Sequence, residues 1–151
     1  MTEFTPPNPA FEALVRETVA RQQVMSTLGA ELTSVVPGAT EIRFPFRQEM
    51  TQQHGFLHAG IVTAVVDTAC GAAAFTLMPE HTGVLTIEYK VNFLAPAAGD
   101  YFVARGRVIK PGRNVMVCTG EVVAIQGERE TTIAVMQTTM MVVRDRPNIV
   151  G

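Results

Sequence analysis

Hydrophobic residues near the start of the chain recur at the spacing of one helix face. Phe11, Leu14, Val15 and Val19 are separated by polar residues, which predicts a helix over residues 8–26. The pattern then changes, because ELTSVV and TEIRFPF stand on either side of a Pro-Gly pair. Two strand-like runs around such a turn predict a β-hairpin over residues 30–46.

A longer apolar run extends from Ala59 to Met78, and Asp67 is the only charged residue in it. The run has about the length of a membrane span, but an Asp at mid-bilayer is costly and the flanks carry no basic cluster. A helix that is apolar on all sides must otherwise be covered by its own protein. We therefore expect one long central helix with a sheet curved around it.

Four strand-like segments follow this helix and are separated by turn residues. In the first segment, apolar residues alternate with polar ones, which predicts that five side chains share one face of the strand: Leu85, Ile87, Tyr89, Val91 and Phe93. The fold class expected is α+β, with an antiparallel sheet of about five or six strands around one long helix, plus an N-terminal helix. A single domain is expected over residues 1–151, with its core at about residues 30–143.

Composition narrows the classes of protein that fit. The formal net charge is −2, which argues against a general nucleic-acid-binding role. Hydrophobic residues make up 47% of the chain, a balance typical of a protein whose surface is partly covered by another subunit. The first residues carry no signal-peptide pattern, and Cys70 and Cys118 lie in apolar segments. Both observations predict a cytoplasmic protein with reduced thiols.

Asp67 is the first candidate for chemistry. An ionised carboxylate that is buried without partners costs several kcal/mol, so Asp67 either pairs within the core or has a raised pKa that prepares it as a base or nucleophile. Thr63 and Thr68 are the nearby partners for the first alternative. Free backbone N–H groups around Ala59 and Gly60, at the positive end of the helix dipole, could polarise a carbonyl oxygen.

Two histidines precede the central helix. His54 and His58 are four residues apart, but Gly55 and the loop-like flanks argue against a metal-binding helix, and no third ligand stands at motif spacing. We expect His58 to cap or pack near the helix start. A catalytic dyad of either histidine with Asp67 is the alternative.

Basic residues gather between positions 90 and 113. A single acid, Asp100, stands among five of the twelve Lys and Arg residues of the chain: Lys90, Arg105, Arg107, Lys110 and Arg113. A solvated strand edge explains each of these residues taken alone. Together they could hold an anionic ligand that carries phosphate groups.

Two segments of the chain resemble a known family. HAGIVTAVVDTACGAAAF, at residues 58–75, resembles the signature of hotdog-fold acyl-CoA thioesterases of the phenylacetate-degradation type, an HGG triplet followed by Asp or Glu. TIEYKVNFLAPA, at residues 86–97, resembles the strand that follows it in that branch of the 4-hydroxybenzoyl-CoA thioesterase superfamily. The resemblance implies the hotdog fold, subunits paired edge to edge as a homodimer or as a homotetramer of two dimers, and active sites at the dimer interface.

The resemblance also assigns roles to individual residues. Asp67 falls at the catalytic carboxylate, and Gln52 falls where an amide positions water or substrate. Ala59 supplies the N–H that polarises the thioester carbonyl, and Thr86 orients the attacking water. Gln52 and Ala59 of one subunit would meet Asp67 and Thr86 of the other. Ala59 departs from the family pattern, because it replaces the middle glycine while keeping the N–H.

The activity implied is hydrolysis of an aryl or short-to-medium-chain acyl-CoA to free acid and CoA, with the carboxylate as base or nucleophile. Contacts to the substrate and its CoA are assigned to His58, Gly60, Lys90, Arg113 and Asn114. No cofactor is expected beyond the CoA of the substrate, and no metal, nucleic acid or membrane partner. The alternatives are a hotdog hydratase-dehydratase of enoyl or 3-hydroxyacyl thioesters, which needs a His acting with an acid, and a non-catalytic acyl-CoA-binding protein.

Overall fold

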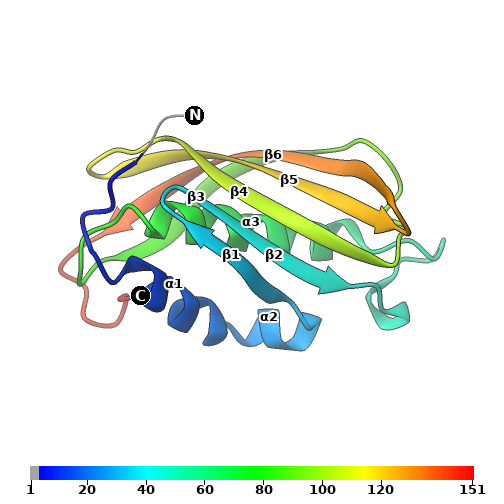
Figure 1. Ribbon diagram of the computed structural model, residues 1–151, viewed down its shortest axis with the longest axis horizontal. Helices are drawn as coiled ribbons and strands as arrows, with labels where there is room; N and C mark the ends of the chain where they lie inside the picture. Colours follow the sequence, from blue (N-terminus) through cyan, green and yellow to red (C-terminus); the bar gives the residue numbers. More distant parts are fainter. Residues whose placement is uncertain (1–3) are drawn as a thin grey trace.

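The computed structural model describes residues 4–151 and combines helices with a six-stranded antiparallel sheet (Figure 1). The helices are α1 (Phe11–Ala20), α2 (Gln23–Leu28) and α3 (Ala59–Phe75), and a short 3-10 helix, η1, spans Gln48–Met50. The strands are β1 (Glu31–Val36), β2 (Ala39–Pro45), β3 (Gly83–Phe93), β4 (Tyr101–Lys110), β5 (Val115–Gln126) and β6 (Arg129–Val143). The predicted α+β architecture is therefore confirmed.

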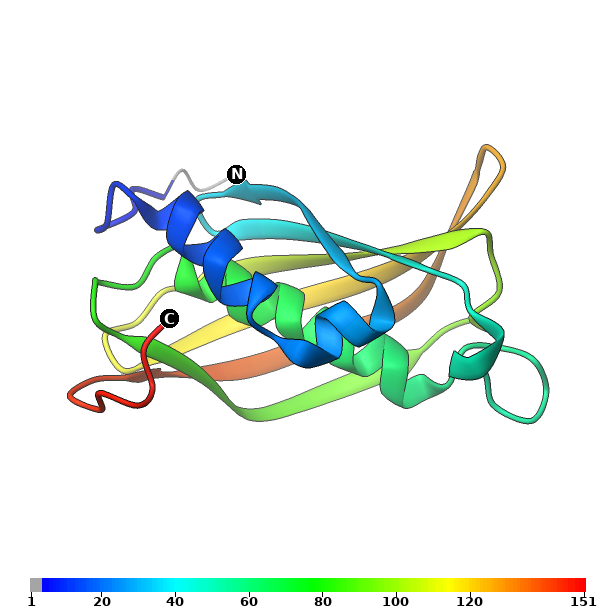
Figure 2. The same ribbon diagram turned by 90° about the horizontal axis from the view of Figure 1, so that it is seen from below.

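The strands are ordered β1-β2-β4-β5-β6-β3 across the sheet, and α3 packs against one face. After α3, the chain therefore forms β3 at one edge of the sheet and then returns to the middle of the sheet to form β4. Figure 2 shows β3 as the outermost strand along one side, with α3 in front of the sheet. β3 pairs with β6 alone among the described strands, so its other edge has free backbone hydrogen-bonding groups.

The N-terminal helix differs from the prediction of one helix over residues 8–26. Gln22 has extended backbone angles (φ −73°, ψ 105°), which end α1 and start α2 at a corner. α1 crosses α3 on the side away from the sheet (Figure 2). Val15 and Val19, both predicted to face inwards, are 1% and 6% exposed and belong to the core that α3 shares with the sheet.

Glycines in the sheet allow α3 to approach it closely. A Cβ at Gly106 of β4 would collide with the backbone carbonyl of Ala69, and a Cβ at Gly120 of β5 would lie 2.8 Å from the Cys70 sulfur. The absence of side chains at these two positions therefore lets the α3 backbone lie close to β4 and β5. Among the helices that the structure describes, none is both long enough and apolar enough to cross a membrane.

A β-bulge in β3 interrupts the predicted alternation of its side chains. The register with β6 slips between Thr86 and Glu88, so Leu85 pairs with the exposed Met141 while Tyr89 pairs with the buried Thr138. Opposed residues in an antiparallel pair point to the same face. Leu85 and Tyr89 therefore lie on opposite faces, and the prediction that all five apolar residues share a face is wrong.

Candidate active site

Asp67 lies in the middle of α3 and faces Thr86 on β3. The Thr86 hydroxyl oxygen is 3.0 Å from Oδ1 and 3.2 Å from Oδ2 of the carboxylate, to which it donates its proton. The bulge after Thr86 makes this contact possible, because Thr86 pairs with the buried Met140 and so faces the helix. The partners considered from sequence do not bind Asp67: Thr63 donates to the Ala59 carbonyl and Thr68 to Gln22.

The surroundings of Asp67 favour its protonated form. Burial raises the pKa of the Asp67 carboxyl above its usual value of 3.8, and the hydrogen bond from Thr86 offsets part of that rise. None of the ion pairs among residues 4–151 includes Asp67. A half-buried carboxylate with one hydroxyl donor and no cation is therefore a stronger base than an exposed aspartate.

The start of α3 presents backbone N–H groups. His58 is the N-cap, and its Nδ1 accepts a hydrogen bond from the Gly60 N–H at 2.9 Å, as expected for a capping residue. The Gly60 N–H is thus engaged, which corrects the expectation that it is free. Ala59 is exposed, and as the first helical residue its N–H has no acceptor within α3. The Ala59 amide is therefore the group that can polarise a carbonyl.

Gln52 lies near this helix start. Gln52, His58, Ala59 and Phe93 line an open cleft of about 510 Å³. The Gln52 side-chain oxygen accepts a hydrogen bond from the His54 backbone N–H, which fixes the orientation of the amide. Two of the four predicted catalytic residues, Gln52 and Ala59, are thus brought together within one subunit.

The other pair, Asp67 and Thr86, lies elsewhere. Asp67 follows Ala59 by eight residues in α3, which at about 1.5 Å per residue places them about 12 Å apart along the helix axis. One thioester group cannot contact both at that separation. The structure of one subunit therefore contains two separated halves of the predicted catalytic set.

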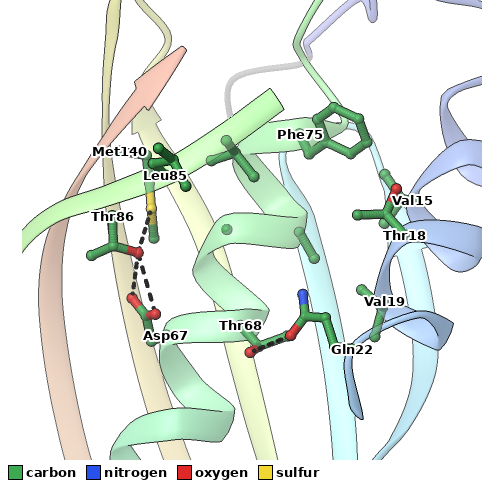
Figure 3. Close-up of a pocket in the computed structure, with 13 residues that line it drawn as sticks. Val15, Thr18, Val19, Gln22, Asp67, Thr68, Phe75, Leu85, Thr86 and Met140 are labelled. Atoms are coloured by element: carbon green, nitrogen blue, oxygen red, sulfur yellow. Dashed lines mark hydrogen bonds between the residues drawn. The ribbon is translucent and has the colours of Figure 1, made fainter. Parts of the chain in front are cut away.

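A groove crosses α3 beside Asp67 (Figure 3). We call it the α1–β3 groove; it has a volume of about 200 Å³, and its walls include Val15, Val19, Gly71, Phe75, Leu85 and Thr86. Figure 3 shows Asp67 and Thr86 on the β3 side, with Val15, Val19 and Gln22 facing them from α1 and the α1–α2 corner. Gln22 Oε1 accepts a hydrogen bond from the Thr68 hydroxyl at 3.1 Å.

The predicted contacts to CoA are scattered within one subunit. Lys90 Nζ donates to Asn92 Oδ1 at 2.6 Å on exposed β3. Arg113 and Asn114 are exposed in the β4–β5 turn, which lies at the opposite end of the molecule from the start of α3 (Figure 1). Arg105 is bound by three carboxylates, Glu41, Glu121 and Glu130, at 2.7 to 3.3 Å. Arg105 is therefore not available to bind a phosphate group, and the prediction that it belongs to a phosphate-binding cluster is wrong.

The histidines, cysteines and acids of the described chain offer no second site of chemistry. Within residues 4–151, no hydrogen bond joins Asp67 to His54 or His58, so the alternative dyad is not formed in one subunit. Burial raises the pKa of the Cys118 thiol to about 12 and that of Cys70 well above its usual value, which makes both poor nucleophiles. In the described part of the chain, no three His, Cys, Asp or Glu residues group closely enough to hold a metal ion.

Sequence reasoning missed the α1–β3 groove and the residues that shape it. Gln22 carries no local signal, because its partner Thr68 is 46 residues away. Gly71 does carry a local signal in the sequence. A glycine inside a long helix is less stable than an alanine, which indicates that the position has a role in packing or binding.

Comparison with known proteins places the chain among thioesterases. A family model described as the thioesterase superfamily matches residues 54–131. The crystal structure of a thioesterase family protein from Silicibacter pomeroyi is 49% identical, covers 89% of this chain and 98% of its own, and superposes with a TM-score of 0.87. A Saccharolobus solfataricus protein provisionally named an esterase is 33% identical over 68% of each chain.

A further relative shares the fold at lower identity. The PaaI protein of the E. coli phenylacetic acid degradation operon is 20% identical, covers 87% of this chain and 91% of its own, and has a TM-score of 0.78. At that identity the similarity establishes a shared fold and nothing about substrate.

Proposed function

Because the chain belongs to the thioesterase superfamily, we propose that it hydrolyses an aryl or short-to-medium-chain acyl-CoA to the free acid and CoA, with Asp67 as the catalytic carboxylate. One observation carries the proposal: Asp67 is half-buried, has no cationic partner among residues 4–151, and accepts a hydrogen bond from Thr86 beside a groove. A structural aspartate at this depth would instead be expected to pair with a cation or several donors.

The Ala59 amide holds the thioester carbonyl in this proposal. Its N–H lies at the N-terminus of the 17-residue α3, where the helix dipole favours negative charge. The tetrahedral intermediate places a full charge on that oxygen, so the amide binds the transition state more tightly than the substrate. Gln52 lies in the same cleft and orients the substrate or the water.

Asp67 and Thr86 act on the opposite side of the thioester carbon. As a base, Asp67 takes a proton from water that Thr86 orients, and the hydroxide adds to the carbonyl carbon to form the tetrahedral intermediate. The C–S bond breaks when this intermediate collapses. The thiolate of CoA leaves and then takes up that proton. As a nucleophile, Asp67 forms a mixed anhydride that water hydrolyses in a second step. Single-turnover hydrolysis in heavy-oxygen water detects the nucleophilic route in which water attacks the Asp67 carbonyl of the anhydride, because that route labels the Asp67 carboxylate and leaves the product acid unlabelled.

Two copies of the chain are needed to complete this site. Ala59 and Asp67 flank Thr63 by four residues on either side, so a two-fold axis beside Thr63 would place Ala59 of each copy opposite Asp67 of the other. The α3 face that such pairing would cover is the incompletely buried one and carries small residues: Gly60, Thr63, Ala64 and Asp67.

The edge strand supports the same pairing. Ile87 and Tyr89 of β3 are 54% and 49% exposed, on a strand whose outer backbone edge is unpaired in one subunit. Long apolar edge strands associate with other strands unless they are protected. Antiparallel pairing of β3 with β3 of a second copy would join the two sheets and bury these side chains. The homodimer is thus the smallest assembly that forms the proposed site.

CoA phosphates are assigned to exposed basic side chains near that interface. Lys90 lies on the edge strand, so pairing of two copies brings it to the boundary between them. Arg113 and Asn114 lie at the end of one subunit that is remote from its own Ala59. In an antiparallel dimer, that end would lie on the same side as the start of α3 of the second copy. A compartment is not identified by any of these features, and the cytoplasmic location stays a prediction.

The test is a thiol-release assay with purified protein on aryl and aliphatic acyl-CoAs, run beside a mass measurement of the oligomer. We expect release of free CoA from at least one substrate, and loss of about 10²- to 10⁴-fold in kcat/KM in Asp67→Asn. Turnover that is equal in Asp67→Asn and the wild type, or absent from the wild type on every substrate, would refute the proposal.

A further inference from the structure

The α1–β3 groove has the size of a pocket for the acyl part of a substrate, and apolar side chains form about half of its wall. It begins beside Asp67 and Thr86, continues over α3, and is bounded by Val15 and Val19 of α1 and by Phe75 (Figure 3). We propose that the acyl group lies in this groove, with Gly71 as its floor and Val19 as its far wall, and that these two residues set the size of the acyl group. This inference rests on the proposed thioesterase function.

Gly71 is the observation that carries the inference furthest. A Cβ at this position would meet one neighbouring atom within 4 Å, the Met140 Cε, at an ordinary contact distance of 3.9 Å. Neither packing nor backbone conformation therefore requires glycine here, in contrast to Gly106, where a Cβ would collide with α3. Alanine would stabilise the helix. The benefit of glycine is the open space above it, and that space is the groove.

On the side of the groove opposite β3, a hydrogen bond and burial fix the position of α1 relative to Asp67. Thr68 follows Asp67 in α3 and donates to Gln22 at the α1–α2 corner, so the far wall is tied to the helix turn that carries the carboxylate. Val15 and Val19 are anchored in the core by burial. The distance between the reacting carboxylate and the α1 wall is thus built into the fold.

The volume of the groove indicates which acyl groups fit. An apolar protein cavity of roughly 150 Å³ holds one benzene molecule. A groove of about 200 Å³ accordingly takes a single aryl ring or an aliphatic chain of similar volume, and a long-chain fatty acyl group would extend beyond it. The apolar part of the wall is formed by Val15, Val19, Ala72, Phe75, Val84, Leu85 and Met140. The polar part is formed by Thr18, Gln22, Asp67, Thr68 and Thr86.

The test compares kcat/KM across a series of acyl-CoAs: acetyl, butanoyl, hexanoyl, octanoyl, dodecanoyl, benzoyl and phenylacetyl. Gly71→Val fills the floor, and we expect the ratio of hexanoyl to acetyl turnover to fall about tenfold or more relative to wild type. Gly71→Ala should give a smaller fall in the same direction and melt at or above the wild-type temperature. Val19→Ala enlarges the groove and should raise the ratio of octanoyl to hexanoyl turnover.

Ala13→Val is the matched control, because Ala13 is exposed on α1 and does not line the groove. It should leave every ratio as in the wild type. If folded Gly71 and Val19 variants change turnover of all substrates equally, or change none, the assignment of the groove is wrong while the proposed function stands. If the wild type releases no thiol from any acyl-CoA, the proposed function fails and this inference fails with it.

Discussion

Thr86 of β3 donates a hydrogen bond to Asp67 of α3, with 3.0 Å between Thr86 Oγ1 and Asp67 Oδ1. The contact depends on three features that are distant in the sequence: a half-buried helix position, an edge strand, and a bulge that turns Thr86 towards the helix. It joins a group that can take a proton to a group that can hold a water molecule. The proposed chemistry depends on this pair.

Thr86→Ala should lower kcat/KM by roughly 10- to 100-fold, because water or carboxylate loses its orientation. Thr86→Ser keeps the hydroxyl and should retain most of the activity. The hydrogen bond from Thr86 lowers the pKa of Asp67, so its loss should move the acidic limb of the pH–rate profile to higher pH in Thr86→Ala and not in Thr86→Ser. Equal profiles in all three proteins would show that Thr86 does not act on Asp67.

The pH dependence of the wild type should report Asp67 itself. The reaction needs the ionised carboxylate, and burial raises its pKa, so activity should fall with decreasing pH around a midpoint above the ordinary aspartate value of 3.8. The measurement is kcat/KM against pH, with circular dichroism at each pH to exclude unfolding. A midpoint at or below 3.8 would contradict the assigned burial.

Asp67→Asn should be inactive and yet at least as stable as the wild type at neutral pH. A carboxyl whose pKa is raised on folding binds its proton more tightly in the folded state, so its contribution to stability is present below the unfolded pKa and is lost as pH rises through the folded pKa. Asn carries no charge and avoids that loss. The melting temperature of Asp67→Asn minus that of wild type should therefore increase between pH 4 and pH 7; a decrease would contradict the raised pKa.

Gly106→Ala should destabilise the protein by about 1–3 kcal/mol, because its Cβ would overlap the Ala69 carbonyl where α3 approaches β4 most closely. Gly71→Ala is the matched control in α3 and has no such overlap. Urea titrations of both variants measure the difference. Equal stability of the two variants would show that α3 and β4 do not approach as closely as described.

Much of the architecture could be predicted from the sequence, because it depends on local patterns. The Pro-Gly turn identified the β1–β2 hairpin, and the apolar run identified α3 from its first residue, Ala59. His58 was expected to cap that helix and does so through Nδ1. The resemblance of residues 58–75 to thioesterases is confirmed by the family model.

What could not be predicted depends on contacts between distant parts of the chain. Neither Gly nor Pro marks the corner at Gln22, so one helix was expected where two occur. The bulge after Thr86 lies in a continuous run of strand-forming residues, so counting alternate positions assigned Leu85 to the same face as Tyr89. The α1–β3 groove has walls from four elements, α1, α3, β3 and β6, and no local pattern describes it.

The most direct test of the shared site uses two inactive variants with complementary defects. Asp67→Asn removes the carboxylate. Ala59→Pro removes the N–H at the first position of α3, where proline is tolerated and where the preceding His58 already has extended backbone angles (φ −62°, ψ 136°). Each variant alone should lose about 10²-fold or more in kcat.

Thiol release by an equimolar mixture of the two variants, refolded together, is the decisive measurement. In a mixed dimer, one site combines the intact Ala59 of one copy with the intact Asp67 of the other. With random pairing, half of the dimers carry one such site out of two, so we predict about a quarter of wild-type activity. If the mixture is no more active than the separate variants, Asp67 and Ala59 do not form a site across two copies of the chain.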